Sequence, residues 1–226
     1  MNINYINAST KLHETNQNYG KASEYFEKGT MKNLLTIPKA VNSACKIESI
    51  SSLLDHGCGK GGLIDLLKQE LPDLQDTYGY DPGVNKFKHK PGKKFDIVTS
   101  IDVLEHVGRD QIASTLKEIK LLTSKFFFFC IDLLPASKSI DGRNAHFLIA
   151  PSDWWVQQIK VEFSVMTIIE VGEMKDRSPY PMHLFGCASE TAKHLKIMNE
   201  FLANVHIANQ RWMFNPEQKC LQIYPA

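Results

Sequence analysis

The stretch Leu53-Leu54-Asp55-His56-Gly57-Cys58-Gly59-Lys60-Gly61-Gly62 joins a short apolar run, 50–55, to a segment with helical spacing of apolar residues, 63–71. This order predicts a strand, a tight loop and a helix. Glycines at 57, 59 and 61 let the backbone turn sharply and approach a ligand, because no Cβ atom stands in the way. Glycines 57, 59 and 62 also fit the G-x-G-x-x-G spacing of dinucleotide-binding loops, so the spacing alone leaves NAD open as the ligand.

Two acidic residues beside this loop narrow the choice of ligand. Asp81 ends the next predicted strand, 77–81, where a carboxylate can accept hydrogen bonds from ribose hydroxyls. Asp55 directly precedes the loop and is a poor neighbour for a pyrophosphate, because like charges repel. It suits a cofactor with cationic groups, and S-adenosylmethionine (SAM) carries an ammonium and a sulfonium. Asp81 fits either cofactor, and Asp55 favours SAM over NAD.

The rest of the chain alternates predicted strands and helices. Strands are expected at 95–100 and 125–133, and helices at 31–47, 109–122, 153 onward from an N-cap at Ser152, and 190–203. The run 125–133 is almost entirely apolar, as in a central strand buried on both faces. The last strands, 163–171 and 183–188, follow each other without a helix. The pattern predicts an α/β fold with a mostly parallel sheet and an antiparallel pair at one edge.

The segment Phe95-Asp96-Ile97-Val98-Thr99-Ser100-Ile101-Asp102-Val103-Leu104-Glu105-His106-Val107 points to a family. It resembles the fourth-strand region of class I SAM-dependent methyltransferases, in which a D-V-L-E-H-V-like ending is frequent. With D-x-G-C-G-x-G and Asp81, three motifs occur in that family's order, and the resemblance covers roughly residues 48–188. It implies a Rossmann-like α/β fold: a seven-stranded, mostly parallel sheet with an antiparallel final hairpin and helices on both faces. It also implies a SAM-dependent methyltransferase (EC 2.1.1.-) whose product is S-adenosylhomocysteine. The residues that it assigns to the cofactor are Asp55, Gly57, Cys58, Gly59, Gly61, Asp81, Ser100, Ile101, Asp102 and Val103.

One segment departs from the family pattern. About fourteen residues separate Asp81 from Phe95, so the usual third strand and its adenine-contacting acid are shortened or absent, and the adenine contact is left unassigned. The segment carries six basic residues: Lys86, Lys88, His89, Lys90, Lys93 and Lys94. Two interpretations stay open, a solvated loop and a patch that contacts phosphates.

The loop 133–152 is expected to face the acceptor, because loops that leave the carboxyl ends of strands line the binding crevice of open α/β sheets. Methyl transfer is an in-line displacement, so the enzyme aligns the acceptor and removes its proton where necessary. His146 is the first candidate for a catalytic base and His106 the second. Arg143 is a candidate clamp for a carboxylate or phosphate of the acceptor. The alternatives are a structural hydrogen bond from His146 and a structural or cofactor-edge role for His106.

Composition is that of an ordinary soluble domain: 226 residues, 43% hydrophobic and 23% charged, with a formal net charge of +1. No apolar run approaches the roughly 20 residues of a membrane span, the polar N-terminus predicts no secretory signal, and five scattered cysteines predict no disulfide framework. We therefore expect a cytoplasmic protein without a membrane partner. No metal is expected, because the histidines and cysteines lack metal-ligand spacing. The oligomeric state is left open.

The predicted domains are an N-terminal arm or lid at 1–30, the methyltransferase domain at 31–188 and a C-terminal helical extension at 189–226. The predicted function is methyl transfer from SAM to oxygen of a small-molecule or glycan-like acceptor. An RNA methyltransferase is one alternative, although the chain lacks the N-P-P-Y or D-P-P-Y strings with which many DNA amino-methyltransferases hold a base. A non-catalytic SAM-binding or scaffold protein is the other.

Overall fold

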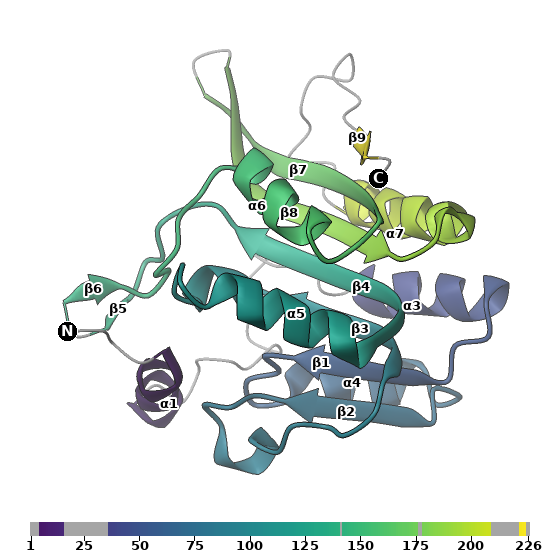
Figure 1. The fold of residues 1–226 in the computed structure, drawn as a ribbon, viewed down its shortest axis with the longest axis horizontal. Helices are drawn as coiled ribbons and strands as arrows, with labels where there is room; N and C mark the ends of the chain where they lie inside the picture. The colour runs from purple at the N-terminus through teal and green to yellow at the C-terminus, as the bar shows by residue number, and fades with distance from the viewer. Residues whose placement is uncertain (1–4, 16–35, 141, 176–177, 209–221, 225–226) are drawn as a thin grey trace.

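A mixed β-sheet with helices on both faces organises the chain (Figure 1). The computed structural model describes residues 5–15, 36–140, 142–175, 178–208 and 222–224. The strands lie in the order β2-β1-β3-β4-β8-β7-β9. They are β1 (Ser52–His56), β2 (Asp76–Tyr80), β3 (Phe95–Ile101), β4 (Thr123–Asp132), β7 (Val165–Lys175), β8 (Ser178–Ser189) and β9 (Gln222–Tyr224). The first four are parallel to one another, whereas β8, β7 and β9 each pair with their neighbours antiparallel.

Two apolar cores lie on the two faces of this sheet. One is covered by α3 (Thr36–Ile47), α4 (Gly62–Glu70) and α7 (Leu195–Ala208), the other by α5 (Ile112–Leu122) and α6 (Ser152–Lys160). The central strand β4 serves both, because alternate side chains of a strand point to opposite faces. Phe126 and Phe128 belong to the first core and Phe127 and Phe129 to the second, and all four are fully buried. The predicted central strand is confirmed.

The Rossmann-like α/β fold and its antiparallel edge are also confirmed, but the strand count differs from the family pattern. Between Asp81 and Phe95 the chain forms a 3-10 helix, η2 (Asn85–Phe87), and no strand. The body of the sheet therefore has six strands, and the seventh, β9, is a three-residue segment that pairs with β7 at the opposite edge. The expectation of a family-like seven-stranded sheet is not confirmed.

Smaller elements surround the carboxyl ends of the parallel strands. They are α1 (Tyr5–Thr15), η3 (Leu104–His106), and a separate two-stranded hairpin of β5 (Ser139–Ile140) and β6 (Arg143–Asn144). The predicted N-cap at Ser152 is wrong by one residue. Pro151 has the extended N-cap conformation, and Ser152 is the first residue of α6. Residues 1–4 and 16–30 of the predicted arm, 31–35 of the predicted methyltransferase domain, and 209–221 and 225–226 of the predicted extension lie outside the described residues, so the domain division stays a prediction.

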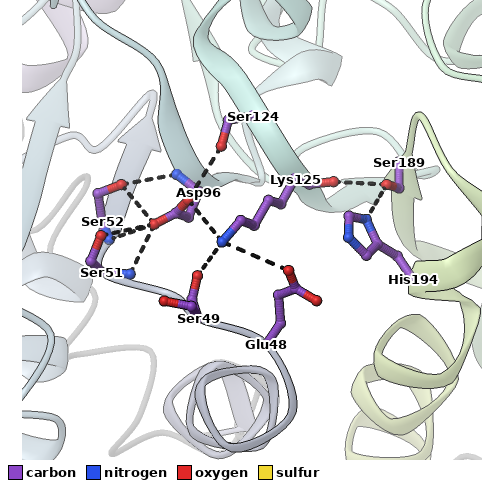
Figure 2. A network of polar contacts seen from close by, with 9 residues as sticks. All are labelled: Glu48, Ser49, Ser51, Ser52, Asp96, Ser124, Lys125, Ser189 and His194. Carbon is purple, nitrogen blue, oxygen red and sulfur yellow. Dashed lines mark hydrogen bonds and ion pairs between the residues drawn. The ribbon is translucent and has the colours of Figure 1, made fainter.

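A polar network ties together the amino-terminal ends of β1, β3 and β4, at the edge opposite the glycine loop (Figure 2). Asp96 accepts hydrogen bonds from the backbone N–H groups of Ser51, at 2.8 Å, and Ser52, at 3.2 Å, and its other oxygen lies 3.3 Å from Lys125 Nζ. Burial alone would raise the pKa of Asp96, but these hydrogen bonds and the Lys125 charge lower it below its ordinary value. These contacts join β1, β3 and β4 at their amino-terminal ends. Among the helices of the described residues, none is long and apolar enough to cross a membrane.

Candidate functional site

The glycine loop leaves β1 in a conformation that few other residues could adopt. Gly57, Gly59 and Gly61 have φ values of +83°, +54° and +84°, in the left-handed region that disfavours residues with a Cβ atom. Gly57 is also confined by packing, because a Cβ there would lie 2.5 Å from Val103 Cγ1. The loop is held to the end of β2 by hydrogen bonds from the N–H groups of Gly57 and Cys58 to the Tyr80 carbonyl. The backbone conformation therefore favours glycine at all three positions, and at Gly57 the packing of Val103 also excludes a larger residue.

Asp81 connects this loop to the turn after β2. Its two carboxylate oxygens accept hydrogen bonds from Gly59 N, at 2.9 Å, and Gly83 N, at 2.8 Å, and the residue is only 3% exposed. A carboxylate has about four acceptor positions, so two backbone partners leave capacity for ribose hydroxyls. Helix α1 lies beside the carboxyl ends of the parallel strands (Figure 1). Its His13 Nε2 is 3.8 Å from Asp81 Oδ2.

Asp55 is a buried carboxylate at the end of β1. It is 4% exposed, and Thr99 Oγ1 donates a hydrogen bond to its Oδ1 at 2.8 Å. The pKa of Asp55 is raised to about 7, mainly by burial and also by the charge of Asp81, and the Thr99 hydrogen bond offsets part of this rise. An adjacent cation would stabilise the ionised form and lower this pKa.

The short segment after Asp81 closes against the glycine loop instead of forming a third strand. The Phe87 ring of η2 packs on Gly61, where a Cβ would lie 2.7 Å from Phe87 Cζ, and on Gly79 of β2. Two of the lysines in this segment form ion pairs, Lys90 with Glu118 at 2.8 Å and Lys93 with Asp76.

Four of the sequence-predicted cofactor residues, 100–103, lead from the end of β3 into η3. Ser100 is fully buried, and its Oγ has no hydrogen-bond partner among the residues that the structure describes, whereas Ile101 is half-buried. Asp102 has a φ of +53°, rare for a residue other than glycine, and Cys130 Sγ donates a hydrogen bond to its Oδ1. Val103 packs against Gly57. The sequence-predicted cofactor residues therefore lie together at the carboxyl ends of the parallel strands. They include the buried Cys58, whose Sγ lies next to Gly79.

The two candidate catalytic histidines, His106 and His146, lie next to each other. The His106 and His146 rings meet edge to face, with centroids 4.8 Å apart. Nδ1 of His106 bonds to the Ala145 carbonyl at 2.8 Å, and Nδ1 of His146 bonds to the Leu134 carbonyl. Because a carbonyl can only accept, each Nδ1 donates, and the lone pair of each neutral ring is on Nε2. Burial, together with the neighbouring His146, lowers the pKa of His106 to about 4, so this ring is neutral near pH 7.

The loop that carries His146 is fixed by residues that sequence reasoning did not select. The Asn144 side chain binds both the N–H and the carbonyl of Ala136, and its Oδ1 also accepts from His146 N at 2.9 Å. Leu148 N donates to the carbonyl of Glu105. Glu105 itself is fully buried within the D-V-L-E-H-V motif. Arg143 is exposed on β6, and none of the described contacts joins it to either histidine.

A family model described as a methyltransferase domain matches residues 24–146, more than half of the chain. The chain belongs to the methyltransferase domain family. It is a class I, SAM-dependent methyltransferase, and SAM is the cofactor of that class. No curated protein matches this methyltransferase in sequence.

Solved structures resemble this methyltransferase in fold. Magnesium protoporphyrin IX methyltransferase (ChlM) from Synechocystis PCC 6803, with bound S-adenosylhomocysteine, is 15% identical over 82% of this chain and 96% of its own, with a TM-score of 0.54. The plantazolicin methyltransferase BpumL, in complex with the same product, is 12% identical over 82% of this chain and 95% of its own, with a TM-score of 0.53. An O-methyltransferase family protein from Burkholderia thailandensis is 11% identical over 63% of this chain, with a TM-score of 0.46, and this chain spans about half of its length (52%).

Proposed function

We propose that this methyltransferase binds SAM across the carboxyl ends of β1, β2 and β3 and transfers its methyl group to an oxygen of a small-molecule or glycan-like acceptor. The proposed cofactor residues are Asp55, Gly57, Cys58, Gly59, Gly61, Asp81, Ser100, Ile101, Asp102 and Val103. Three left-handed glycines bring backbone close to the ligand without Cβ atoms, and Asp81 has acceptor capacity for the ribose.

Asp55 supports a cationic ligand in particular. A carboxylate buried to this degree, with one side-chain hydrogen bond, is costly to ionise. The ammonium or sulfonium of SAM beside it would offset that cost, whereas a pyrophosphate would increase it.

The observation that carries the acceptor proposal is the His106–His146 pair. Two imidazoles with Nε2 as the basic nitrogen lie beside the strand that the cofactor would border. In the proposed reaction the acceptor oxygen forms a bond to the methyl carbon as the carbon–sulfur bond breaks. The bonding pair passes to sulfur, which becomes the neutral thioether of S-adenosylhomocysteine. The hydroxyl proton passes to an imidazole Nε2, His146 being the first choice because it lies on the loop that follows β4 and is expected to face the acceptor.

Three features bear on the remaining predictions: the lysines after Asp81, helix α1 and Arg143. RNA as the acceptor loses support because Lys90 and Lys93 are already paired with carboxylates. We propose α1 as part of a lid, since His13 lies against Asp81, and cofactor entry would then require this helix to shift. Arg143 stays a proposed anion clamp whose exposed position suits contact with a bulky acceptor.

The test begins with calorimetric titration of the full chain with SAM and S-adenosylhomocysteine, with NAD as control. Binding of the first two without NAD supports the cofactor proposal, whereas binding of NAD alone contradicts it. Glycans and hydroxylated metabolites are then screened with SAM labelled in the methyl group. His146→Gln should retain SAM affinity and lose turnover, while the exposed-site control His89→Gln should retain both. If His146→Gln turns over normally, a catalytic role for His146 is excluded.

A further inference from the structure

Three potential metal-ligand side chains converge where η3 meets the loop after β6. Glu105, His106 and His146 each offer a ligand atom, and these atoms all lie within 4.8 Å of one another. The first two are adjacent in the chain and the third follows forty positions later. That separation explains why histidine spacing predicted no metal.

Glu105 supplies an independent sign of a missing ligand. Its side chain is fully buried, and Oε1 accepts a hydrogen bond from Asp132 N at 3.1 Å. Its Oε2 is also buried and has no hydrogen-bond partner among the described residues. An ionised carboxylate with an unsatisfied oxygen in such a place is costly unless a proton or a cation compensates it.

Both histidines are oriented as metal-binding histidines usually are. A ligating imidazole generally donates its second ring N–H to a carbonyl or carboxylate, which fixes the tautomer and the ring plane. Here Nδ1 of His106 donates to the Ala145 carbonyl and Nδ1 of His146 to the Leu134 carbonyl. Each Nε2 is then the nitrogen that can bind a cation.

The chemistry of these three donors indicates which cations suit them. Two imidazoles and one carboxylate form a donor set that suits Zn²⁺, Mn²⁺, Fe²⁺ or Co²⁺ better than Mg²⁺. Three residues before Glu105, Asp102 has the left-handed φ of +53°, and backbone strain of this kind clusters at functional sites.

We propose that this methyltransferase binds a divalent transition-metal cation through the three converging side chains, Glu105, His106 Nε2 and His146 Nε2. Bonds of about 2.1 Å place two ligands of one ion at most about 4.2 Å apart. The present separation of up to 4.8 Å therefore requires side-chain movements of under about 1 Å. The loop is already held beside η3 by the Leu148–Glu105 and His106–Ala145 hydrogen bonds, so the backbone can stay in place.

The consequence for catalysis rests on the proposed function. A cation at this site would hold the acceptor oxygen beside the methyl donor and lower the pKa of its hydroxyl, as bound metals do for water. Both Nε2 atoms would then be ligands, and the hydroxyl proton would leave to solvent instead of to His146. The oxygen–methyl bond still forms as the carbon–sulfur bond breaks.

The experiment uses the full chain, stripped with a chelator and titrated without SAM. Co²⁺ binding is followed by visible absorption, and Zn²⁺, Mn²⁺ and Mg²⁺ binding by calorimetry. We expect one ion per chain, and affinity at least tenfold weaker in Glu105→Gln and in His146→Gln. The exposed controls His89→Gln and Glu70→Gln should bind as the unaltered chain does. Thermal melting of each variant separates loss of the site from loss of the fold.

Each outcome decides one proposal. Stoichiometric binding that is lost in Glu105→Gln and His146→Gln alone supports the metal site. Absent binding, or equal binding in all folded variants, overturns it. If SAM binds and methyl transfer proceeds equally with and without chelator, the catalytic role of the metal is excluded and the proposed function stands. If the metal binds but SAM does not, the metal site stands and the proposed function fails.

Discussion

The affinity for SAM should depend on pH through Asp55. Without a ligand, burial raises the pKa of this carboxyl to about 7. A cationic ligand prefers the ionised carboxylate, so binding should be tight above pH 7 and weaken as pH falls through 7. If the bound ligand restores an ordinary pKa of about 4, affinity falls about tenfold between pH 8 and pH 6, and nearly tenfold again by pH 5.

Calorimetric titration with SAM at pH 5, 6, 7 and 8 measures this effect, and proton release into buffers of different ionisation enthalpy measures it independently. The matched control is Asp55→Asn, whose amide oxygen can still accept the Thr99 hydrogen bond. An amino group of the ligand also titrates near pH 8, but its protonation at lower pH acts in the opposite sense, and the Asn variant reports it alone. Equal pH profiles for the two proteins would refute the assignment of Asp55 to a cationic ligand.

Three further changes test the loop and the frame beneath it. Gly57→Ala should lower the free energy of unfolding by about 2–5 kcal/mol, from the left-handed backbone and the overlap with Val103. Val103→Ala in the same chain should recover only the overlap part, and an equal loss in both backgrounds, measured by urea denaturation, would contradict this. Asp81→Ala should weaken SAM binding by about 1.5–3 kcal/mol, and Asp81→Asn by less, because one oxygen remains for the backbone; unchanged affinity in calorimetry would remove the ribose assignment. Asp96→Ala should lower the free energy of unfolding by about 2–3 kcal/mol, compared with little change in the exposed Asp73→Ala.

Sequence periodicity predicted the parallel body of the sheet because those strands are short apolar runs between glycine-rich turns. The four phenylalanines of β4 are an example, since a strand buried on both faces has no polar alternation. The missing third strand was visible as a short interval between Asp81 and Phe95, but not what replaces it. Phe87 packs on Gly61 and Gly79 through contacts that no local pattern specifies. The start of α6 was missed by one residue because Pro151 occupies the N-cap position that Ser152 was expected to fill.

The cofactor side of the site was easier to predict than the acceptor side, because its residues follow one another along the chain. Asp55 and the glycines occur within seven positions, and Asp81 follows at the end of the next strand. Neighbouring parallel strands end at the same edge of the sheet, so the sequence order becomes spatial proximity. The bridging role of Asp81, which binds both Gly59 and Gly83, required the folded geometry.

The geometry of the acceptor side depends instead on how the loop after the β5–β6 hairpin packs against η3. Asn144 holds this loop in place, because its side chain accepts hydrogen bonds from the N–H groups of Ala136 and His146. The Glu105 carbonyl accepts a further hydrogen bond from Leu148 N in the same loop. In the sequence Glu105 is one letter of a family motif, and only its fully buried side chain with an unsatisfied Oε2 distinguishes it from a structural residue. His146, 41 positions later in the chain, becomes a neighbour of Glu105 through backbone hydrogen bonds, and no periodic pattern in the sequence indicates such bonds. The chemistry of the acceptor site therefore follows from the hydrogen bonds that orient His106 and His146, and a measurement of metal binding tests that chemistry directly.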